Sequence, residues 1–173
     1  LIIFLSVIIL LIISGLFYFR SMIQDEDVPQ TENLIPDNLP KKALAIFAHP
    51  DDEITIIGTM KMLKSQGVET GICYMTRGEA GLNGSIIDVS KIKELADTSL
   101  NKLKKVLGQR RTREVDNVAN ILGLNHHEMF DFPDSGTSNV PLDSLKKVVR
   151  SLIRKYRPSI LFTLDDKVGL YGH

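Results

Sequence analysis

An apolar hexapeptide that leads directly into a cluster of ionisable side chains constrains this chain more than any other feature. Residues 43–48 read Ala-Leu-Ala-Ile-Phe-Ala, and His49-Pro50-Asp51-Asp52-Glu53 follow. The hexapeptide predicts a buried strand, which should end at Pro50 because proline has no backbone N–H to donate to a sheet. We therefore expect the imidazole and the three carboxylates at the carboxyl end of a strand, where ligands bind in open α/β sheets.

The side-chain types in this cluster suit a divalent cation. Zinc binds imidazole nitrogen and carboxylate oxygen, and a catalytic zinc keeps one position open for water. One of two adjacent aspartates can bind the ion while the other accepts a proton from water. The residues alone leave a second interpretation open, in which Asp51 and Asp52 form a solvated acidic turn at the start of the next helix.

Length, charge and cysteine content limit the class of protein. The 173 residues can form one domain with a substantial core. The 21 basic residues balance the 21 acidic ones, so nothing in the net charge favours a nucleic-acid partner. Cys73 is the single cysteine of the sequence, which precludes an intramolecular disulfide and predicts a buried, inert thiol.

The first 20 residues predict a membrane anchor. Residues 1–19 are uncharged and rich in Leu, Ile, Val and Phe, and Arg20 follows. This run is long enough to cross a bilayer as a helix, and it has no convincing cleavage site for a signal peptidase, although a cleaved signal remains the alternative. Residues 21–40 have the composition of a tether, and the domain is expected at 41–173. We expect a single-pass membrane protein whose catalytic domain is extracytoplasmic.

The rest of the chain predicts an α/β fold with a mostly parallel sheet flanked by helices. Strands are expected at residues 68–75, 128–130 and 159–163. Helices are expected from Ile54 to Gly67, within 84–109, from about Arg110 to Gly123, and from Leu142 to Tyr156. The last helix should turn Leu145, Val148, Val149 and Ile153 inward. His126 and His127 are expected as exposed residues of a polar turn.

Several motifs together resemble the LmbE/PIG-L-like family of zinc-dependent N-acetylglucosamine de-N-acetylases. They are the HPDDE sequence at 49–53, the T-x-G-E-x-G loop at 76–81, the R-x-x-E helix at 111–123, the F-P-D-S-G loop at 132–136 and the closing T-x-D…G-x-Y-G-H sequence at 163–173. The resemblance covers about residues 41–173 and implies a Rossmann-like fold. The segment at 84–109 is longer than the corresponding segment usually is in the family, and we interpret it as an insertion near the rim of the site.

The resemblance also implies roles for individual residues. His49 and Asp52 would bind Zn²⁺ or another divalent metal, Asp51 would be the general base, and Glu53 would be a supporting carboxylate. Arg111 and Asp134 would contact the sugar, with Arg110 and Arg113 as alternatives to Arg111. Tyr171 would lie over the substrate and His173 would assist catalysis. The third metal ligand would follow three residues after His173, so we expect a fragment truncated at its C-terminus; because the sequence begins with Leu1 rather than Met, we expect truncation there too.

The implied function is hydrolysis of an N-acetyl group on a glycoconjugate that contains N-acetylglucosamine. The apolar N-terminal segment favours a lipid-linked or cell-envelope substrate. Two alternatives stay open at this point. One is a membrane-tethered carbohydrate-binding module without catalysis. The other is a deacetylase of thiol-precursor glycosides, of the bacillithiol or mycothiol type.

Overall fold

The computed structural model describes residues 2–23, 31, 33–81 and 100–165. The chain divides into two compact units, residues 1–34 and 35–173. The first unit contains the helix α1 (Ile2–Ile23), which runs three residues past the predicted end of the anchor. By length and composition α1 could cross a membrane, and a signal sequence near the N-terminus would pass the same test.

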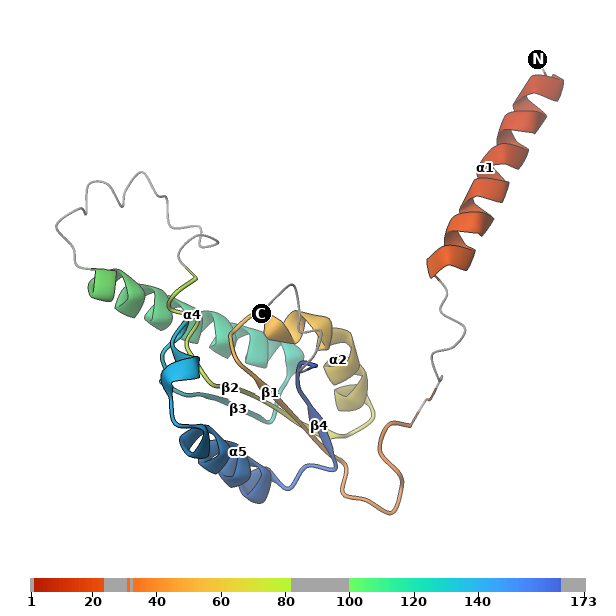
Figure 1. Ribbon diagram of the computed structural model, residues 1–173. Coiled ribbons are helices and arrows are strands. Elements are labelled where there is room, and N and C mark those ends of the chain that lie inside the picture. The colour runs from red at the N-terminus through yellow and green to blue at the C-terminus, as the bar shows by residue number, and fades with distance from the viewer. Residues whose placement is uncertain (1, 24–30, 32, 82–99, 166–173) are drawn as a thin grey trace. The chain divides into compact units, whose positions relative to one another are not determined.

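The second unit is built on a sheet of four parallel strands, as the sequence predicts. The strands are β1 (Lys42–Phe47), β2 (Glu69–Tyr74), β3 (His126–Met129) and β4 (Ile160–Phe162). Their order across the sheet is β3-β2-β1-β4 (Figure 1), and every pair of neighbours is parallel. Because parallel strands end at the same edge, the segments that follow these strands are brought to one side of the unit.

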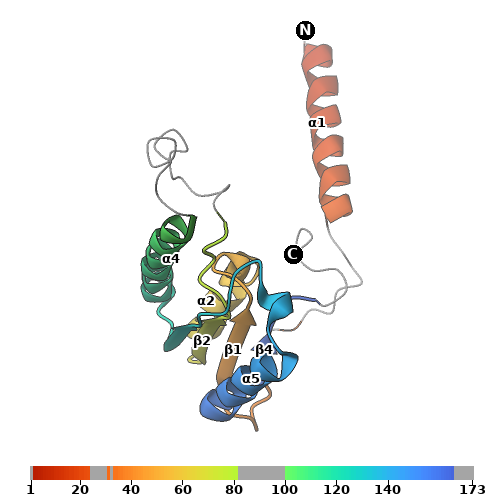
Figure 2. The ribbon, with the colours of Figure 1, turned by 60° about the vertical axis from the view of Figure 1, so that its left-hand side comes forward.

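Helices cover both faces of this sheet, so the α/β prediction is confirmed. They are α2 (Ile57–Ser65), α4 (Leu100–Leu122) and α5 (Leu142–Tyr156), with short 3₁₀ turns η1 (Asp52–Thr55) and η2 (Thr137–Asn139). Figures 1 and 2 show α2 and α4 on one side of the strands and α5 on the other. Alternate strand residues point to opposite faces, so each helix layer packs on a different half of the strand residues.

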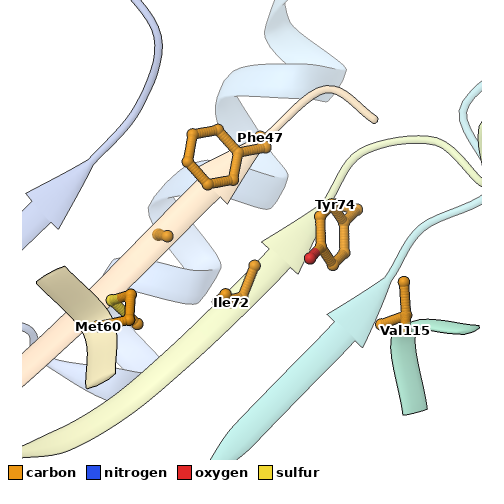
Figure 3. Packing of buried hydrophobic residues seen from close by; sticks show 6 residues of the cluster. Phe47, Met60, Ile72, Tyr74 and Val115 are labelled. Atoms are coloured by element: carbon orange, nitrogen blue, oxygen red, sulfur yellow. The ribbon is translucent and has the colours of Figure 1, made fainter. Parts of the chain in front are cut away.

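The buried apolar side chains form two clusters, one on each face of the sheet. The first lies between the sheet and the layer of α2 and α4, where Met60 and Val115 meet Phe47, Ile72 and Tyr74 (Figure 3). The second lies under α5, where the buried Leu152 packs with strand residues of the opposite parity: Leu44, Ile46, Cys73 and Met75. Because both faces of β1 and β2 are buried, these strands read as nearly continuous apolar runs.

Backbone hydrogen bonds hold the ends of three strands together at the carboxyl edge. The N–H of Thr76 and its hydroxyl both donate to the carbonyl of Ala48, at 3.0 Å each. On the other side of β2, the N–H of Phe132 donates to the carbonyl of Met75 at 3.2 Å. The segments after β1, β2 and β3 therefore leave the sheet side by side.

The helix that carries Arg111 differs from the prediction. It does not begin near Arg110, because residues 100–122 form one continuous helix of 23 residues. Arg110 and Arg111 therefore lie in the middle of α4, away from the unfavourable positive end of a helix dipole. Of the predicted insertion helix, residues 100–109 are the first part of α4, and residues 84–99 lie outside the described part of the chain.

Two further expectations about local structure are wrong. The side chains of His126 and His127 are exposed at 37% and 36%, as predicted, but the residues belong to β3 and pair with Gly71 and Ile72, because pairing with β2 begins two residues earlier than the apolar pattern indicates. In α5, Val148 and Val149 pack on the core as predicted, but the buried residue is Leu152 and Ile153 is 39% exposed. Leu152 lies on the same face of the helix as Val148 and Val149, and Ile153 is turned by about 100° from it toward the edge of that face.

Burial of the predicted elements is less complete than expected at two places. In the segment after the aspartate pair, Met60 and Leu63 are buried, but Ile54 is 71% exposed, because residues 52–55 form a 3₁₀ turn instead of the first turn of α2. In β4, predicted as a buried strand, Leu161 is 43% exposed. β4 is an edge strand of the described sheet and pairs there with β1 alone. Its side chains are therefore covered less than those of a central strand.

Candidate functional site

The turn after β1 is held by its own carboxylates. The N–H of His49 donates to Oδ2 of Asp52 at 2.9 Å, and the N–H of Asp51 donates to Oε2 of Glu53 at 2.8 Å. Asp52 and Glu53 are buried, at 2% and 6% exposure. Asp51 adopts φ 107°, a conformation that is rare for a residue with a side chain. These backbone contacts hold Asp51 in this conformation, with its own carboxylate 61% exposed.

Glu53 is in turn linked to the core. Tyr74 at the end of β2 is 1% exposed, and its hydroxyl lies close enough to the Glu53 carboxylate to interact with it. Burial, together with the negative charge of Glu53, raises the pKa of Tyr74 far above its usual range. The phenol therefore keeps its proton and can donate it to the carboxylate that anchors the turn.

The His49 ring lies between two carboxylates from different segments. Its Nδ1 atom is buried and lies 3.8 Å from Oδ2 of Asp52. Its Nε2 atom lies 3.1 Å from Oδ1 of Asp134, in the loop after β3. A histidine whose second nitrogen faces a carboxylate is fixed in orientation and tautomer, an arrangement common around metal ligands.

Asp134 is held by the loop that follows β2. The N–H of Ala80 donates to Oδ2 of Asp134 at 2.7 Å, and the N–H of Asp134 donates to Oε1 of Glu79 at 2.9 Å. These reciprocal bonds tie the loop at 76–81 to the loop at 131–136. The sequence analysis assigned no role to Glu79, although Glu79 is the glutamate of the T-x-G-E-x-G pattern and could have been singled out on that ground.

Arg111 reaches the same place from the middle of α4. Its Nη1 atom lies 3.4 Å from both the carbonyl oxygen of Pro50 and Oδ2 of Asp51. Arg110, which the sequence analysis gave as an alternative to Arg111 for contact with the sugar, pairs instead with Glu114 on its own helix. Gly78 permits the close approach: it has φ +66°, and a Cβ there would lie 3.2 Å from Cδ of Pro50.

These side chains surround a pocket of about 170 Å³ at the carboxyl edge of the sheet. Its lining consists of His49, Asp51, Gly78, Ala80, Gly81, Arg111, Asp134 and Ser135. Asp52 and Glu53 lie behind it, so the structure brings together six predicted site residues: His49, Asp51, Asp52, Glu53, Arg111 and Asp134. The other two, Tyr171 and His173, lie outside the described part of the chain.

Two donors at this site, one lining the pocket and one behind it, fit a divalent metal. Two atoms that bind one tetrahedral zinc at about 2.0–2.2 Å stand roughly 3.3–3.6 Å apart. The 3.8 Å between Nδ1 of His49 and Oδ2 of Asp52 is close to that spacing. Among the described residues no group of three or more His, Cys, Asp or Glu side chains is arranged to hold a metal. The donor set found here is therefore partial.

Comparison with known proteins agrees with this arrangement of loops. Residues 44–173 match the family model described as PIG-L: GlcNAc-PI de-N-acetylase. The chain belongs to the PIG-L family. The matched segment begins within β1 and includes every residue of the pocket.

Individual members of the family show what the chain resembles. It is 27% identical over 150 residues to the 1D-myo-inositol 2-acetamido-2-deoxy-alpha-D-glucopyranoside deacetylase of Thermobifida fusca, covering 77% of this chain and 49% of that protein. It is 29% identical over 140 residues to the diacetylchitobiose deacetylase of Thermococcus kodakarensis, covering 80% and 46%.

A solved structure supports the same relationship. The N,N'-diacetylchitobiose deacetylase of Pyrococcus horikoshii superimposes with a TM-score of 0.60 at 26% identity, over 77% of this chain and 44% of that one. The chain spans about half the length of the relatives it matches.

Proposed function

We propose that this chain is part of a metal-dependent hydrolase that removes the N-acetyl group from a glycoconjugate containing N-acetylglucosamine. The observation that carries the proposal is the convergence of His49, Asp51 and Asp134 on one pocket, from loops after two different strands. Arg111 adds a cation from α4. The names of the relatives, which describe deacetylases of an inositol glycoside and of diacetylchitobiose, support this substrate class.

Zn²⁺ or another divalent metal would be held by His49 and Asp52, with the third ligand that the family resemblance implies beyond His173. A bound zinc would polarise the acetyl carbonyl and lower the pKa of its water. Because Nε2 of His49 lies 3.1 Å from Oδ1 of Asp134, a proton on Nε2 would leave the lone pair of Nδ1 available to the metal on the side of Asp52. The buried Asp52 has a fixed position because its Oδ2 atom also accepts the backbone N–H of His49.

Asp51 would act as the general base. Its carboxylate is exposed to the pocket while its backbone is fixed by Glu53, so it can reach a water molecule without losing its position. The water adds to the acetyl carbon, and the C–N bond breaks. The leaving nitrogen takes a proton from an acid of the site, and the products are acetate and the free amino sugar.

His173 and Tyr171 would complete the pocket. As an imidazolium, His173 would donate to the carbonyl oxygen as negative charge develops there, and Tyr171 would assist from above the substrate. Arg111 and Asp134 would orient the sugar. Both side chains already have protein partners, so sugar contacts would use the remaining donors of the guanidinium and the remaining lone pairs of the carboxylate.

A second candidate substrate class has an observation in its favour. Several relatives are named for deacetylation of a 1D-myo-inositol glycoside, which fits a thiol-precursor glycoside of the mycothiol type. The helix α1 instead favours a lipid-linked or cell-envelope substrate, with the enzyme anchored by a single span and its catalytic domain extracytoplasmic. Protease treatment of intact cells tests this: the proposal expects cleavage of residues 41–173, and full protection would contradict it.

The deacetylase itself is tested by incubating the protein with N,N'-diacetylchitobiose and with the inositol glycoside, and measuring release of acetate and free amine. We expect release that stops on addition of a chelator and returns with zinc. Specific sugar binding without any release of acetate would favour a carbohydrate-binding module that lacks catalysis.

A further inference from the structure

Arg77 joins three segments that meet beside the candidate site. It follows Thr76 in the loop after β2, and its Nε atom donates to Oδ1 of Asp131 in the loop after β3. Its Nη1 atom donates to Oγ1 of Thr112, in the middle of α4, at 2.6 Å. One guanidinium group therefore connects α4 to both loops. Position 77 is the variable second position of the T-x-G-E-x-G pattern, so the family motifs assign it no role.

The hydroxyl of Thr112 is a fixed acceptor for this contact. It donates its proton to the carbonyl of Gly108, four residues earlier on α4, at 2.9 Å. A hydroxyl has one proton to donate and two lone pairs with which to accept, so a lone pair stays available to Arg77. The bond to the preceding turn also fixes the rotamer of the threonine. Arg77 therefore contacts α4 through a side chain that is held against the helix itself.

The loop after β2 also packs directly on this part of α4. A Cβ on Gly108 would lie 3.4 Å from Cβ of Arg77 and 3.6 Å from Cβ of Glu79. Gly108 and Thr112 are four residues apart, so they lie on one face of the helix. The loop therefore meets this face at two points, the backbone of Gly108 and the hydroxyl of Thr112.

Arg111, the residue before Thr112, depends on the position of this turn. Its Nη1 atom lies 3.4 Å from both the carbonyl oxygen of Pro50 and Oδ2 of Asp51. These distances are at the long end of hydrogen bonding, so a small displacement decides whether the contacts exist. A rotation of α4 by about 10° would move a guanidinium group that lies several ångströms from the helix axis by about 1 Å. An error of that size in the placement of a binding group can reduce catalysis by about 100-fold.

We propose that Arg77 is a positioning residue for Arg111: by holding Thr112, it fixes the turn of α4 from which Arg111 reaches the pocket. The inference rests on the proposed function for what Arg111 binds, which is the acetylated sugar. Arg77 itself is not among the described residues that line the candidate pocket. Its partner Asp131 is 79% exposed, and exposed ion pairs add little stability, so placement of α4 explains the contact better than stabilisation of the fold.

Two substitutions remove the contact from opposite ends. Thr112→Val keeps the shape of the side chain and loses the hydroxyl, whereas Arg77→Met keeps the apolar stem and loses the guanidinium group. Thr112→Ser is the matched control, because serine retains the hydroxyl. Each substitution is made in the full chain alone and again together with Arg111→Ala. Thermal melts verify that every variant folds.

The first measurement needs no ligand. The NMR signal of the Nε–H group of Arg111 is assigned by its disappearance in Arg111→Ala. We expect this signal to shift in both Thr112→Val and Arg77→Met and to stay in place in Thr112→Ser. The Nε–H signal of Arg110, which pairs with Glu114 on its own helix, should stay in place in all three variants.

The second measurement is the Kd for N,N'-diacetylchitobiose, obtained by calorimetry. We expect Thr112→Val and Arg77→Met to weaken binding about fivefold, as the loss of one hydrogen bond to a charged group allows, and Thr112→Ser to weaken it by less than about twofold. In the Arg111→Ala background neither substitution should weaken binding further, because the group that they position is already gone.

An Arg111 signal that stays in place in Thr112→Val and Arg77→Met would overturn the proposal. Equal losses of affinity with and without Arg111 would also overturn it, because they indicate a purely structural effect. Acetate release from the disaccharide is measured separately. If the full chain neither binds nor hydrolyses the disaccharide, the proposed function is wrong, and the Arg111 signal alone decides whether Arg77 positions that residue.

Discussion

The Nε2 atom of His49 lies 3.1 Å from Oδ1 of Asp134, and this contact joins the turn after β1 to the loop after β3. The sequence motifs predicted a metal ligand at the first position and a sugar contact at the second. Their proximity gives Asp134 a further task, which is to hold the ring of His49.

Asp134→Asn tests the contact itself. Loss of the carboxylate removes the acceptor that fixes the ring of His49, so we expect zinc affinity to fall by about 10- to 100-fold. Competition with a chromophoric chelator measures it. Asp116→Asn is the matched control, because Asp116 also faces a histidine nitrogen, that of His127, at 2.9 Å on the exterior of the unit. Equal zinc affinity in both variants would show that Asp134 does not support metal binding.

His49→Ala tests the metal ligand. The variant lacks the nitrogen donor, and Asp52 alone cannot hold the ion, so we expect the bound zinc to be lost. Elemental analysis of the purified protein gives the zinc content per chain. The His127→Ala variant should retain the content of the unmodified chain. A His49→Ala protein with undiminished zinc would contradict the assignment.

Asp51→Asn tests the general base. The amide has nearly the same shape but cannot accept a proton from water, so we expect turnover to fall by at least about 100-fold while zinc stays bound. Acetate release and zinc content are measured on the same preparation. Retained activity would exclude Asp51 as the base, and joint loss of zinc and activity would indicate a role in binding the metal.

Gly78→Ala tests the tight packing of the loop after β2. The residue has φ +66°, and an added Cβ would lie 3.2 Å from Cδ of Pro50. We expect a loss of about 1–2 kcal/mol in the free energy of unfolding. Gly58→Ala in α2 is the control: it has open space around its Cβ position, and alanine favours a helix, so stability should hold or rise. Urea unfolding gives the free energy of unfolding of both variants. A Gly78→Ala protein as stable as Gly58→Ala would show that the loop tolerates a side chain.

Cys73 should be unreactive in the folded protein. Burial raises the pKa of its thiol from about 9 to about 12. At pH 8 very little thiolate is present, so reaction with a disulfide reagent should be slow and should become fast in denaturant. The raised pKa stabilises the fold below pH 9, and this contribution is lost as the pH rises from 9 toward 12. Rapid labelling of the native protein at pH 8 would show that the β2 core opens readily.

The sequence by itself determined the strands, their parallel arrangement and the edge where the chemistry lies. Residues 43–48 have one plausible environment, a strand buried on both faces, and Pro50 gives it one place to end. The family motifs then supplied the site residues in chain order. The inferences about the strands succeed because they depend on local properties: hydrophobicity, periodicity and the missing N–H of proline.

Only the tertiary structure decided how the loops contact one another. The pairing of His49 with Asp134, the support of Asp134 by Glu79 and the reach of Arg111 to Asp51 each join segments that are distant in sequence. The position of Arg111 also depended on the length of α4, which the sequence divided into two helices. Such contacts follow from the spacing of the strands and the packing of α4 on them, and no local pattern of residues encodes them.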